Sequence, residues 1–214
     1  MTTIKAFLLL ITFLVLSCGS EVLVQNANYY FQPMNFGTEK TYCFTNQNND
    51  AEKSYWIIKS EITPGDTLLR TTVYNNERLI EKYVERVNNG SSKLISYVVY
   101  NGETAEAIDS SACSIIDSLT YSSALGKNDE IKWKVYYKDF NTNNKISLSK
   151  SRKLKSSNEK MQVYLDKVII SVLGSRASYE YSIKSVFEKD KGLTHYYISQ
   201  PEGKSKDYIL TSVN

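Results

Sequence analysis

The chain has few of the residues on which most catalytic and metal sites depend. Among its 214 residues are one histidine, His195, and three cysteines, Cys18, Cys43 and Cys113. One histidine and such widely separated cysteines do not give the ligand spacing of a usual zinc site. The acidic residues do not follow the pattern of a calcium loop. We therefore expect no catalytic residue, no cofactor and no metal.

Motifs of common enzyme classes are also missing. No glycine-rich phosphate loop occurs, and Gly174-Ser175-Arg176 does not form the Gly-x-Ser-x-Gly elbow of serine hydrolases. In a regular strand, His195 would share a face with Leu193 and Tyr197, and a lone histidine there favours a structural hydrogen bond over acid–base catalysis. We expect a protein that is not an enzyme. A carboxylate-based hydrolase stays as a less favoured alternative, because its two acids need only meet in space.

A large excess of charge of one sign is absent. Lysine and arginine number 26 against 23 aspartates and glutamates, which gives a formal net charge of +3. This balance does not favour nucleic acid as a partner. One expected hairpin is strongly basic and could meet anionic lipid headgroups, although lysines that block pairing at a sheet edge are the favoured interpretation. Its basic residues are Lys145, Lys150, Arg152, Lys153, Lys155 and Lys160.

Only one long apolar run is present, and it lies at the beginning of the chain. Lys5 precedes almost uninterrupted apolar residues from Ala6 to Leu16. This run is too short for a permanent transmembrane helix, which needs roughly 20 apolar residues. A positive residue, a short apolar run and small residues after it are typical of a secretory signal peptide. We therefore predict that residues 1–17 are a signal peptide.

The end of this segment, Val15-Leu16-Ser17-Cys18, resembles the lipobox of bacterial lipoproteins. In that family the cysteine receives a diacylglyceryl group and becomes the mature N-terminus. The resemblance implies lipidation of Cys18 and a membrane contact through that anchor. An ordinary signal peptide cut near Cys18, without lipid, is the alternative.

Gly19 stands where proteobacterial lipoproteins retained in the inner membrane have aspartate. The resemblance therefore implies a lipid-anchored protein of the bacterial cell envelope, with the outer membrane, facing the periplasm, favoured over the inner. Residues 18–37 have no sustained periodicity and are expected to be the lipidated N-terminus and a tether. Residues 38–214 are expected to form a single β-rich domain.

Most of this domain consists of short alternating runs separated by turn residues, which is typical of an antiparallel meander. In Glu130 to Phe140, for example, Ile131, Trp133, Val135 and Tyr137 are predicted to share one face. The expected strands are Thr38 to Thr45, Lys53 to Ile62, Thr67 to Tyr74, Arg78 to Val87, Lys93 to Tyr100, Glu130 to Phe140, Lys145 to Lys155, Lys160 to Ser171, Arg176 to Lys189, Leu193 to Ser199 and Lys206 to Val213.

The segment Glu103 to Leu125 differs from the rest. Its apolar residues have a loosely helical spacing, which predicts a short helix around Ser111 to Ser118 or an irregular crossover. The expected fold is mainly β, with about ten or eleven strands in a strongly curved antiparallel sheet and one short helical segment. The sheet could close as a barrel or stay a half-barrel, and a β-sandwich is the alternative.

Three segments of the second half resemble periplasmic half-barrel proteins related to LolA-like lipoprotein carriers, including Bacteroidota lipoproteins of unassigned function. They are Ser123-Ala124-Leu125-Gly126, Phe187-Glu188-Lys189-Asp190-Lys191-Gly192-Leu193 and Tyr208-Ile209-Leu210-Thr211-Ser212-Val213. The resemblance implies a concave apolar surface able to hold acyl chains or lipidated partners. It transfers no functional residue.

Cys43 and Cys113 are free to pair with each other, since an exported protein can form disulfides. Such a bridge would close a loop of about 70 residues and stabilise the fold by roughly 4 kcal/mol. Two buried free thiols are an equally good interpretation. The sequence does not show whether the two Cα atoms lie within bonding range.

Three functions remain in order of preference. The first is a non-enzymatic envelope lipoprotein that binds a hydrophobic ligand or lipidated partner in a curved sheet, which requires a groove or cavity. The second is a structural or assembly accessory of the envelope, which would present a large apolar patch to a partner protein. The third is the carboxylate-based hydrolase, which requires two acids that converge in a cleft.

Overall fold

Alternating apolar and polar residues, interrupted by short turns, make the chain a succession of β-strands. The computed structural model describes residues 39–63, 66–88, 90–100, 114–122, 125–139, 142–201 and 203–214. Its strands are β1 (Glu39–Asn46), β2 (Asn49–Thr63), β3 (Asp66–Asn75), β4 (Arg78–Asn88), β5 (Ser91–Val99), β6 (Ser114–Ile116), β7 (Leu119–Ser122), β8 (Glu130–Lys138), β9 (Lys145–Ser157), β10 (Met161–Val172), β11 (Ser178–Glu188), β12 (Gly192–Ser199) and β13 (Ser205–Val213).

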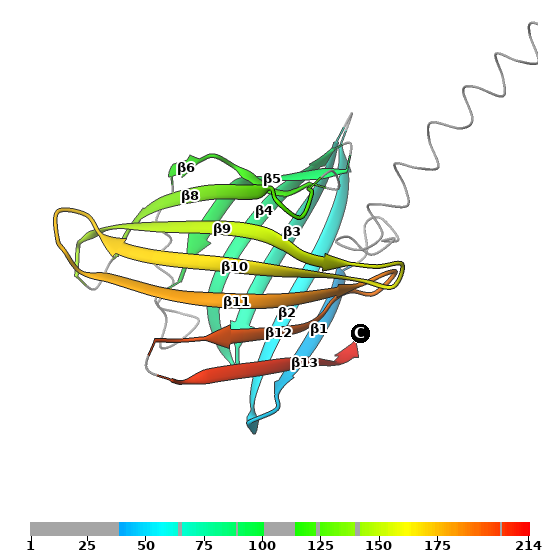
Figure 1. Ribbon diagram of the computed structural model, residues 1–214. Coiled ribbons are helices and arrows are strands. Elements are labelled where there is room, and N and C mark those ends of the chain that lie inside the picture. The colour runs from blue at the N-terminus through cyan, green and yellow to red at the C-terminus, as the bar shows by residue number, and fades with distance from the viewer. Residues whose placement is uncertain are drawn as a thin grey trace, which may run out of the picture.

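All thirteen strands belong to one antiparallel sheet, in the order β6-β8-β9-β10-β11-β12-β13-β1-β2-β3-β4-β5-β7. It consists of two meanders, β1–β5 and β8–β13, which are joined because the first strand pairs with the last. Tyr42 lies opposite Val213, and Thr41 and Asn214 exchange two backbone hydrogen bonds of 2.9 and 3.0 Å. The pairing of β1 with β13 therefore places both ends of the described chain side by side (Figure 1).

The sheet curls until its two meanders face each other. In Figure 1, β8–β12 run across the front and β2–β5 lie behind them at a steep angle. The predicted strongly curved antiparallel sheet is confirmed, as an incompletely closed, half-barrel-like sheet. One continuous sheet also rules out the alternative of a two-sheet sandwich.

The predicted short helix is wrong wherever the structure describes that segment. Residues 114–116 form β6, which pairs with β8, and residues 119–122 form β7, which pairs with β5 at the other edge of the sheet. Between them Asp117 has φ 54°, which turns the chain from one ladder into the other. Sheet edges present unpaired N–H and C=O groups, and these two short ladders outweigh a loose helical pattern. They also raise the strand number above the expected ten or eleven.

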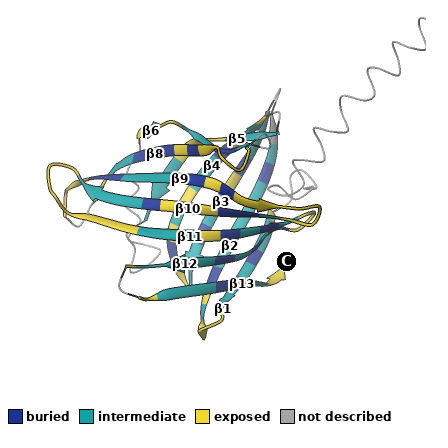
Figure 2. Cartoon of the chain, viewed as in Figure 1, coloured by how far each residue is buried: buried dark blue, intermediate teal, exposed yellow. Residues whose placement is uncertain are grey.

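Alternation along each strand separates an inward face from an outward one (Figure 2). In β8 the side chains of Ile131, Trp133 and Val135 are buried while Lys132 is exposed, as predicted. Buried residues gather in three clusters. They are Tyr121, Leu154, Tyr164 and Phe187 in the first, Tyr42, Phe44, Tyr196 and Tyr208 in the second, and Leu94, Ile131, Trp133 and Val135 in the third.

Several predictions fall outside the described residues: the signal peptide of residues 1–17, the lipidation of Cys18, the tether of residues 18–37, and Cys113. Cys43 lies half-buried in β1, and its pairing with Cys113 stays a prediction. Among the residues that the structure describes, no helix is long and apolar enough to cross a bilayer.

Candidate functional site

The curled sheet encloses a cavity of about 590 Å³ between its two meanders. Every strand except β6 contributes lining residues, because each strand turns one face inward. The lining is mainly aromatic and aliphatic, with a small number of charged and hydroxyl side chains. Cavities of roughly 300–1,000 Å³ with this lining are typical of small-molecule sites.

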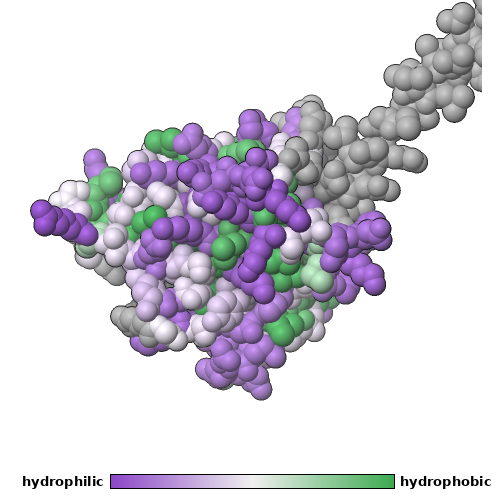
Figure 3. Space-filling model, in the orientation of Figure 1, coloured by the Kyte–Doolittle hydropathy of each residue, from purple (hydrophilic) through white to green (hydrophobic). Residues whose placement is uncertain are grey.

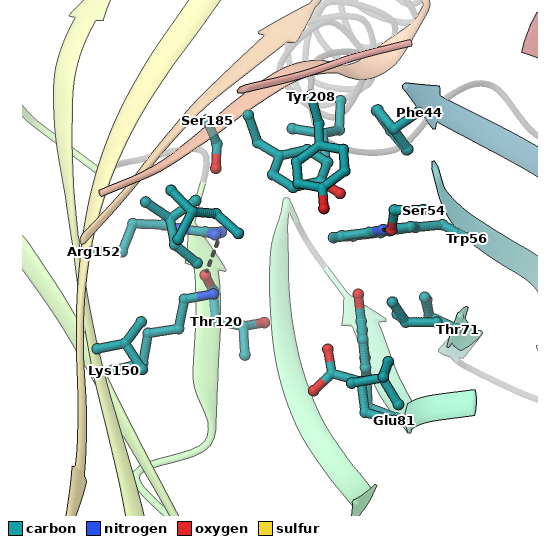
Figure 4. A pocket seen from close by; sticks show the side chains of 18 of the residues that line it. Phe44, Ser54, Trp56, Thr71, Glu81, Thr120, Lys150, Arg152, Ser185 and Tyr208 are labelled. Carbon is teal, nitrogen blue, oxygen red and sulfur yellow. Dashed lines mark hydrogen bonds between the residues drawn. The ribbon is translucent and has the colours of Figure 1, made fainter. Parts of the chain in front are cut away.

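One part of the lining, which we call the aromatic end, consists of Phe44, Trp56, Tyr196 and Tyr208. Tyr196 is at its centre. Its ring lies 5.2 Å from Phe44, edge to face, 4.7 Å from Tyr208, stacked, and 5.8 Å from Trp56. Aromatic pairs with these geometries attract each other beyond the area that they bury. The result is a rigid apolar surface on the β1, β2, β12 and β13 side of the cavity (Figure 4).

The polar atoms at the aromatic end have partners. Trp56 Nε1 donates to Ser54 Oγ at 3.1 Å, and the Tyr208 hydroxyl donates to Glu52 Oε1 at 2.7 Å. Glu52 also pairs with Lys206. Burial alone would raise the pKa of Glu52, but hydrogen bonds from Lys206 and Tyr208 hold it below its usual range. Lys206 and Glu52 thus balance each other in charge.

A pair of cations lies on the β9 wall, and both interact with one carboxylate of β10. Arg152 Nε and Nη2 each donate to Asp166 at 2.8 Å, and Lys150 Nζ lies 3.3 Å from Asp166 Oδ2. Both cations also lie over the ring of Trp133, at 5.2 Å for Lys150 and 5.5 Å for Arg152. Burial opposes ionisation of Asp166, but the two cations hold its pKa below the usual range.

The facing wall, on β4 and β5, carries two carboxyl groups. Glu81 accepts a hydrogen bond from the Tyr97 hydroxyl, and desolvation raises the pKa of Glu81. Glu85 is buried and accepts hydrogen bonds from Ser92 at 3.1 Å and Thr120 at 2.5 Å. Glu81 and Lys150 extend toward the interior from opposite walls (Figure 4).

Side chains also cross the seam where β7 and β8 lie next to each other. Arg152 Nη1 donates to the Thr120 backbone carbonyl at 3.2 Å, the bond that is dashed in Figure 4. Thr120 in turn contacts Glu85 on β4. The chain of contacts from Asp166 through Arg152 and Thr120 to Glu85 therefore joins the two edges of the sheet, where the described strands form no ladder between β7 and β8.

Comparisons with known proteins show the fold. The structure matches a provisionally named lipoprotein of Parabacteroides distasonis with a TM-score of 0.55 and 14% identity, covering 87% of this chain and 99% of that one. It also matches a provisionally named exported protein with a YmcC-like fold from Bacteroides fragilis, with a TM-score of 0.51, 11% identity and the same coverage. No family model matches the chain, and no curated protein does. This chain shares its fold with the two structures.

The basic hairpin is divided between the two faces of the sheet. Lys145, Lys153, Lys155 and Lys160 are exposed, whereas Lys150 and Arg152 line the cavity. The favoured interpretation, lysines that protect a sheet edge, is wrong, because β9 is paired with β8 on one side and with β10 on the other. Alternation along β9 alone decides which cations point inward.

His195 pairs with Asp207 through its Nε2 atom, which is the structural role expected for it. Its predicted alignment with Leu193 is wrong. Val186 and Phe187 are adjacent on β11, but their partners on β12 are His195 and Leu193. One extra residue of β12 therefore lies between those two partners. Such a bulge reverses the face of every later side chain. Leu193 and Tyr196 therefore line the cavity, and His195 is outside the lining.

The hydrolase alternative needs two acids at catalytic separation. Glu81 and Glu85 are four residues apart on one strand, about 13 Å at the usual rise of a strand. Paired glycosidase carboxylates lie roughly 5 to 9.5 Å apart on either side of the bond that they cleave. Among the described residues, no group of three or more histidine, cysteine, aspartate or glutamate side chains could hold a metal ion.

The sequence pattern did not assign four charged residues to the site: Glu81, Lys150 and Arg152 of the lining, and Asp166, which pairs with two of them. A usable signal existed for three of them. Lys150 and Arg152 alternate with polar residues on the same face as Leu148 and Leu154, so the apolar face of β9 runs through them. Asp166 likewise stands between Tyr164 and Val168 on the buried face of β10.

Proposed function

We propose that the protein is a non-enzymatic, lipid-anchored envelope protein that holds a small hydrophobic or amphipathic ligand inside its curled sheet. The cavity of about 590 Å³ carries this proposal. A sheet with a tightly packed interior would have argued against ligand binding. Here the lining combines aromatic rings with a few charged groups, which suits a ligand that has an apolar body and a polar end.

One unpaired acceptor in the lining supports the same proposal. Asn75 Oδ1 is buried and has no hydrogen-bond partner within the described residues. Buried polar atoms are satisfied in the great majority of proteins. A donor group of a molecule inside the cavity would satisfy this oxygen.

The envelope location rests on the signal peptide and lipobox at residues 1–18. It is supported by the names of the two proteins that share the fold, a lipoprotein and an exported protein of Bacteroidota species. We propose that lipidated Cys18 anchors the sheet to the outer membrane and that the sheet faces the periplasm.

The accessory and hydrolase alternatives have less support. The face of the molecule in Figure 3 is mainly hydrophilic, and its apolar side chains form small separate patches rather than one docking surface. The carboxylates of the cavity are hydrogen-bonded to neighbouring side chains, and the two on β4 are far apart for a catalytic pair.

Native mass spectrometry of the protein purified from its own membrane tests the proposal. We expect a small amphipathic molecule to stay bound during purification, so that the measured mass exceeds that of the protein with its lipid anchor. The variant Ser185→Phe should lose it, because Ser185 is buried in the lining and a ring there occupies the cavity.

The matched control is Lys184→Phe, which places the same ring on the neighbouring, exposed residue of β11. This variant should retain the molecule. The protein could instead be purified without a bound small molecule but with a stoichiometric protein partner. That result would contradict ligand binding and favour the accessory alternative.

A further inference from the structure

Two cations of the cavity wall, Lys150 and Arg152, pair with the same carboxylate, Asp166. Arg152 contacts both oxygens of Asp166 in the two-pronged geometry that guanidinium and carboxylate groups favour. Lys150 lies 3.3 Å from one of the same oxygens. Two cations thus share one carboxylate, and Arg152 holds it with the shorter contacts.

Lys150 also has capacity for a further partner. Its ammonium group has three N–H donors, and the contact with Asp166 uses one of them. The side chain is 22% exposed, compared with 6% for Arg152. Because Lys150 lines the cavity, a group inside the cavity can reach its ammonium. Trp133 lies below the same ammonium, at 5.2 Å, and gives it a fixed apolar base.

The other charged groups of the lining are Lys206, Glu81 and Glu85. Lys206 is matched by Glu52. Glu85 already accepts two hydrogen bonds from hydroxyl groups. Glu81 faces Lys150, but one of its oxygens accepts from Tyr97. Desolvation raises the pKa of Glu81, so this carboxyl favours its neutral form more than an exposed glutamate does. An anion beside Lys150 therefore meets less repulsion than the number of carboxyl groups suggests.

We propose that the ligand is a single-chain amphiphile with an anionic head, whose head binds Lys150 above Trp133 and whose chain extends toward the aromatic end. This inference rests on the proposed function and adds the chemical class and orientation of the ligand. A fatty acid and an alkyl phosphate share this chemistry. An uncharged or cationic head of the same chain length lacks the contact with the ammonium.

Fluorescence titration can measure this preference, because the only two tryptophans of the sequence, Trp56 and Trp133, both line the cavity. The full chain with Cys18→Ser, which carries no acyl group, is titrated with laurate, dodecyl phosphate, dodecanol and dodecylamine. We expect at least one of the two anions to bind about tenfold more tightly than dodecanol, as one charged hydrogen bond predicts. The tighter anion identifies the head. Dodecylamine should bind most weakly.

The variant Lys150→Met should reduce the affinity for the anion to that for dodecanol and leave dodecanol binding unchanged. Lys150→Arg should retain the preference for the anion. The control Lys155→Met removes an exposed lysine from the same strand and should change none of the four affinities. Both Lys150 variants keep the Arg152–Asp166 pair that the fold uses.

The possible failures can be told apart. Equal affinities for the anions and dodecanol, or a Lys150→Met variant that keeps the preference for the anion, would overturn the anionic head while the cavity still binds apolar chains. Tighter binding of dodecylamine would overturn it too. If none of the four amphiphiles binds, the proposed function itself fails.

Discussion

At the scale of single residues, Asp166 shows how a buried charge can serve the fold. Its carboxylate is almost completely inaccessible, and it remains ionised because Arg152 and Lys150 surround it. Burial by itself would raise the pKa of Asp166, and the cations outweigh burial. Loss of the carboxylate would leave two cations without their shared partner, which is costlier than the loss of an exposed ion pair.

We predict that Asp166→Asn lowers the free energy of unfolding by about 3 kcal/mol, the usual effect of breaking a buried ion pair. The control Glu180→Gln removes the exposed pair of Glu180 with Lys167 and should cost less than about 1 kcal/mol. Urea denaturation at neutral pH measures both. Equal losses in the two variants would show that Asp166 contributes no more than a surface charge.

The same variant has a predicted dependence on pH. Because the pKa of Asp166 is lower in the folded state, its stabilisation is complete above the unfolded value of about 3.9 and disappears as the pH falls through the folded value. The difference in stability between wild type and Asp166→Asn should therefore shrink on acidification below about pH 4. A constant difference would contradict the direction of the shift.

At the scale of elements, the turn between β6 and β7 decides where the edges of the sheet meet. Asp117 adopts φ 54° between two strands that belong to opposite edges. Next to it, the Ser118 carbonyl accepts from the Leu94 backbone N–H at 2.7 Å and so attaches the turn to β5. The left-handed conformation is tolerated by aspartate and glycine and is strained for β-branched residues.

We predict that Asp117→Val lowers the free energy of unfolding by about 1–2 kcal/mol, whereas Asp117→Gly changes it little. Hydrogen exchange at the Leu94 amide should speed up in the valine variant, since its acceptor is on the residue beside the turn. A valine variant as stable and as protected as the glycine variant would exclude strain at this position.

Strands could be predicted where their partners are also their neighbours in sequence. In β8 and β10, period-two alternation and flanking turns fix both the strand and its buried face, because hairpin partners follow at once. The strands β6 and β7 could not be predicted, because each one exists only through pairing with a remote edge. The face of His195 was missed because a bulge leaves no mark in the pattern of apolar residues.

At the scale of the whole molecule, two sets of contacts stabilise the curled sheet. Pairing of β1 with β13 joins the two meanders, and the contacts from Asp166 through Arg152 and Thr120 to Glu85 cross the seam between the remaining edges. The cavity lies between these two regions. The chain thus keeps its interior partly empty while its edges remain connected.

The resemblance to half-barrel lipoproteins implied a concave apolar surface but not the chemistry of the interior. Alternation predicts inward residues one strand at a time, and it predicted Trp133 and Val135 correctly. The meeting of Lys150 with Asp166, and of Glu81 with Tyr97, depends on register and curvature, which alternation does not encode. The charged part of the site therefore needed the structure.

The central claim is that the interior of the sheet holds an apolar chain, and contact quenching tests it most directly. Laurate with bromine on its terminal carbon is titrated into the Cys18→Ser chain while the fluorescence of Trp56 and Trp133 is followed. We predict saturable quenching that persists in Lys184→Phe and is lost in Ser185→Phe. If the Cys18→Ser chain itself shows no quenching, or quenching that does not saturate, the claim is contradicted.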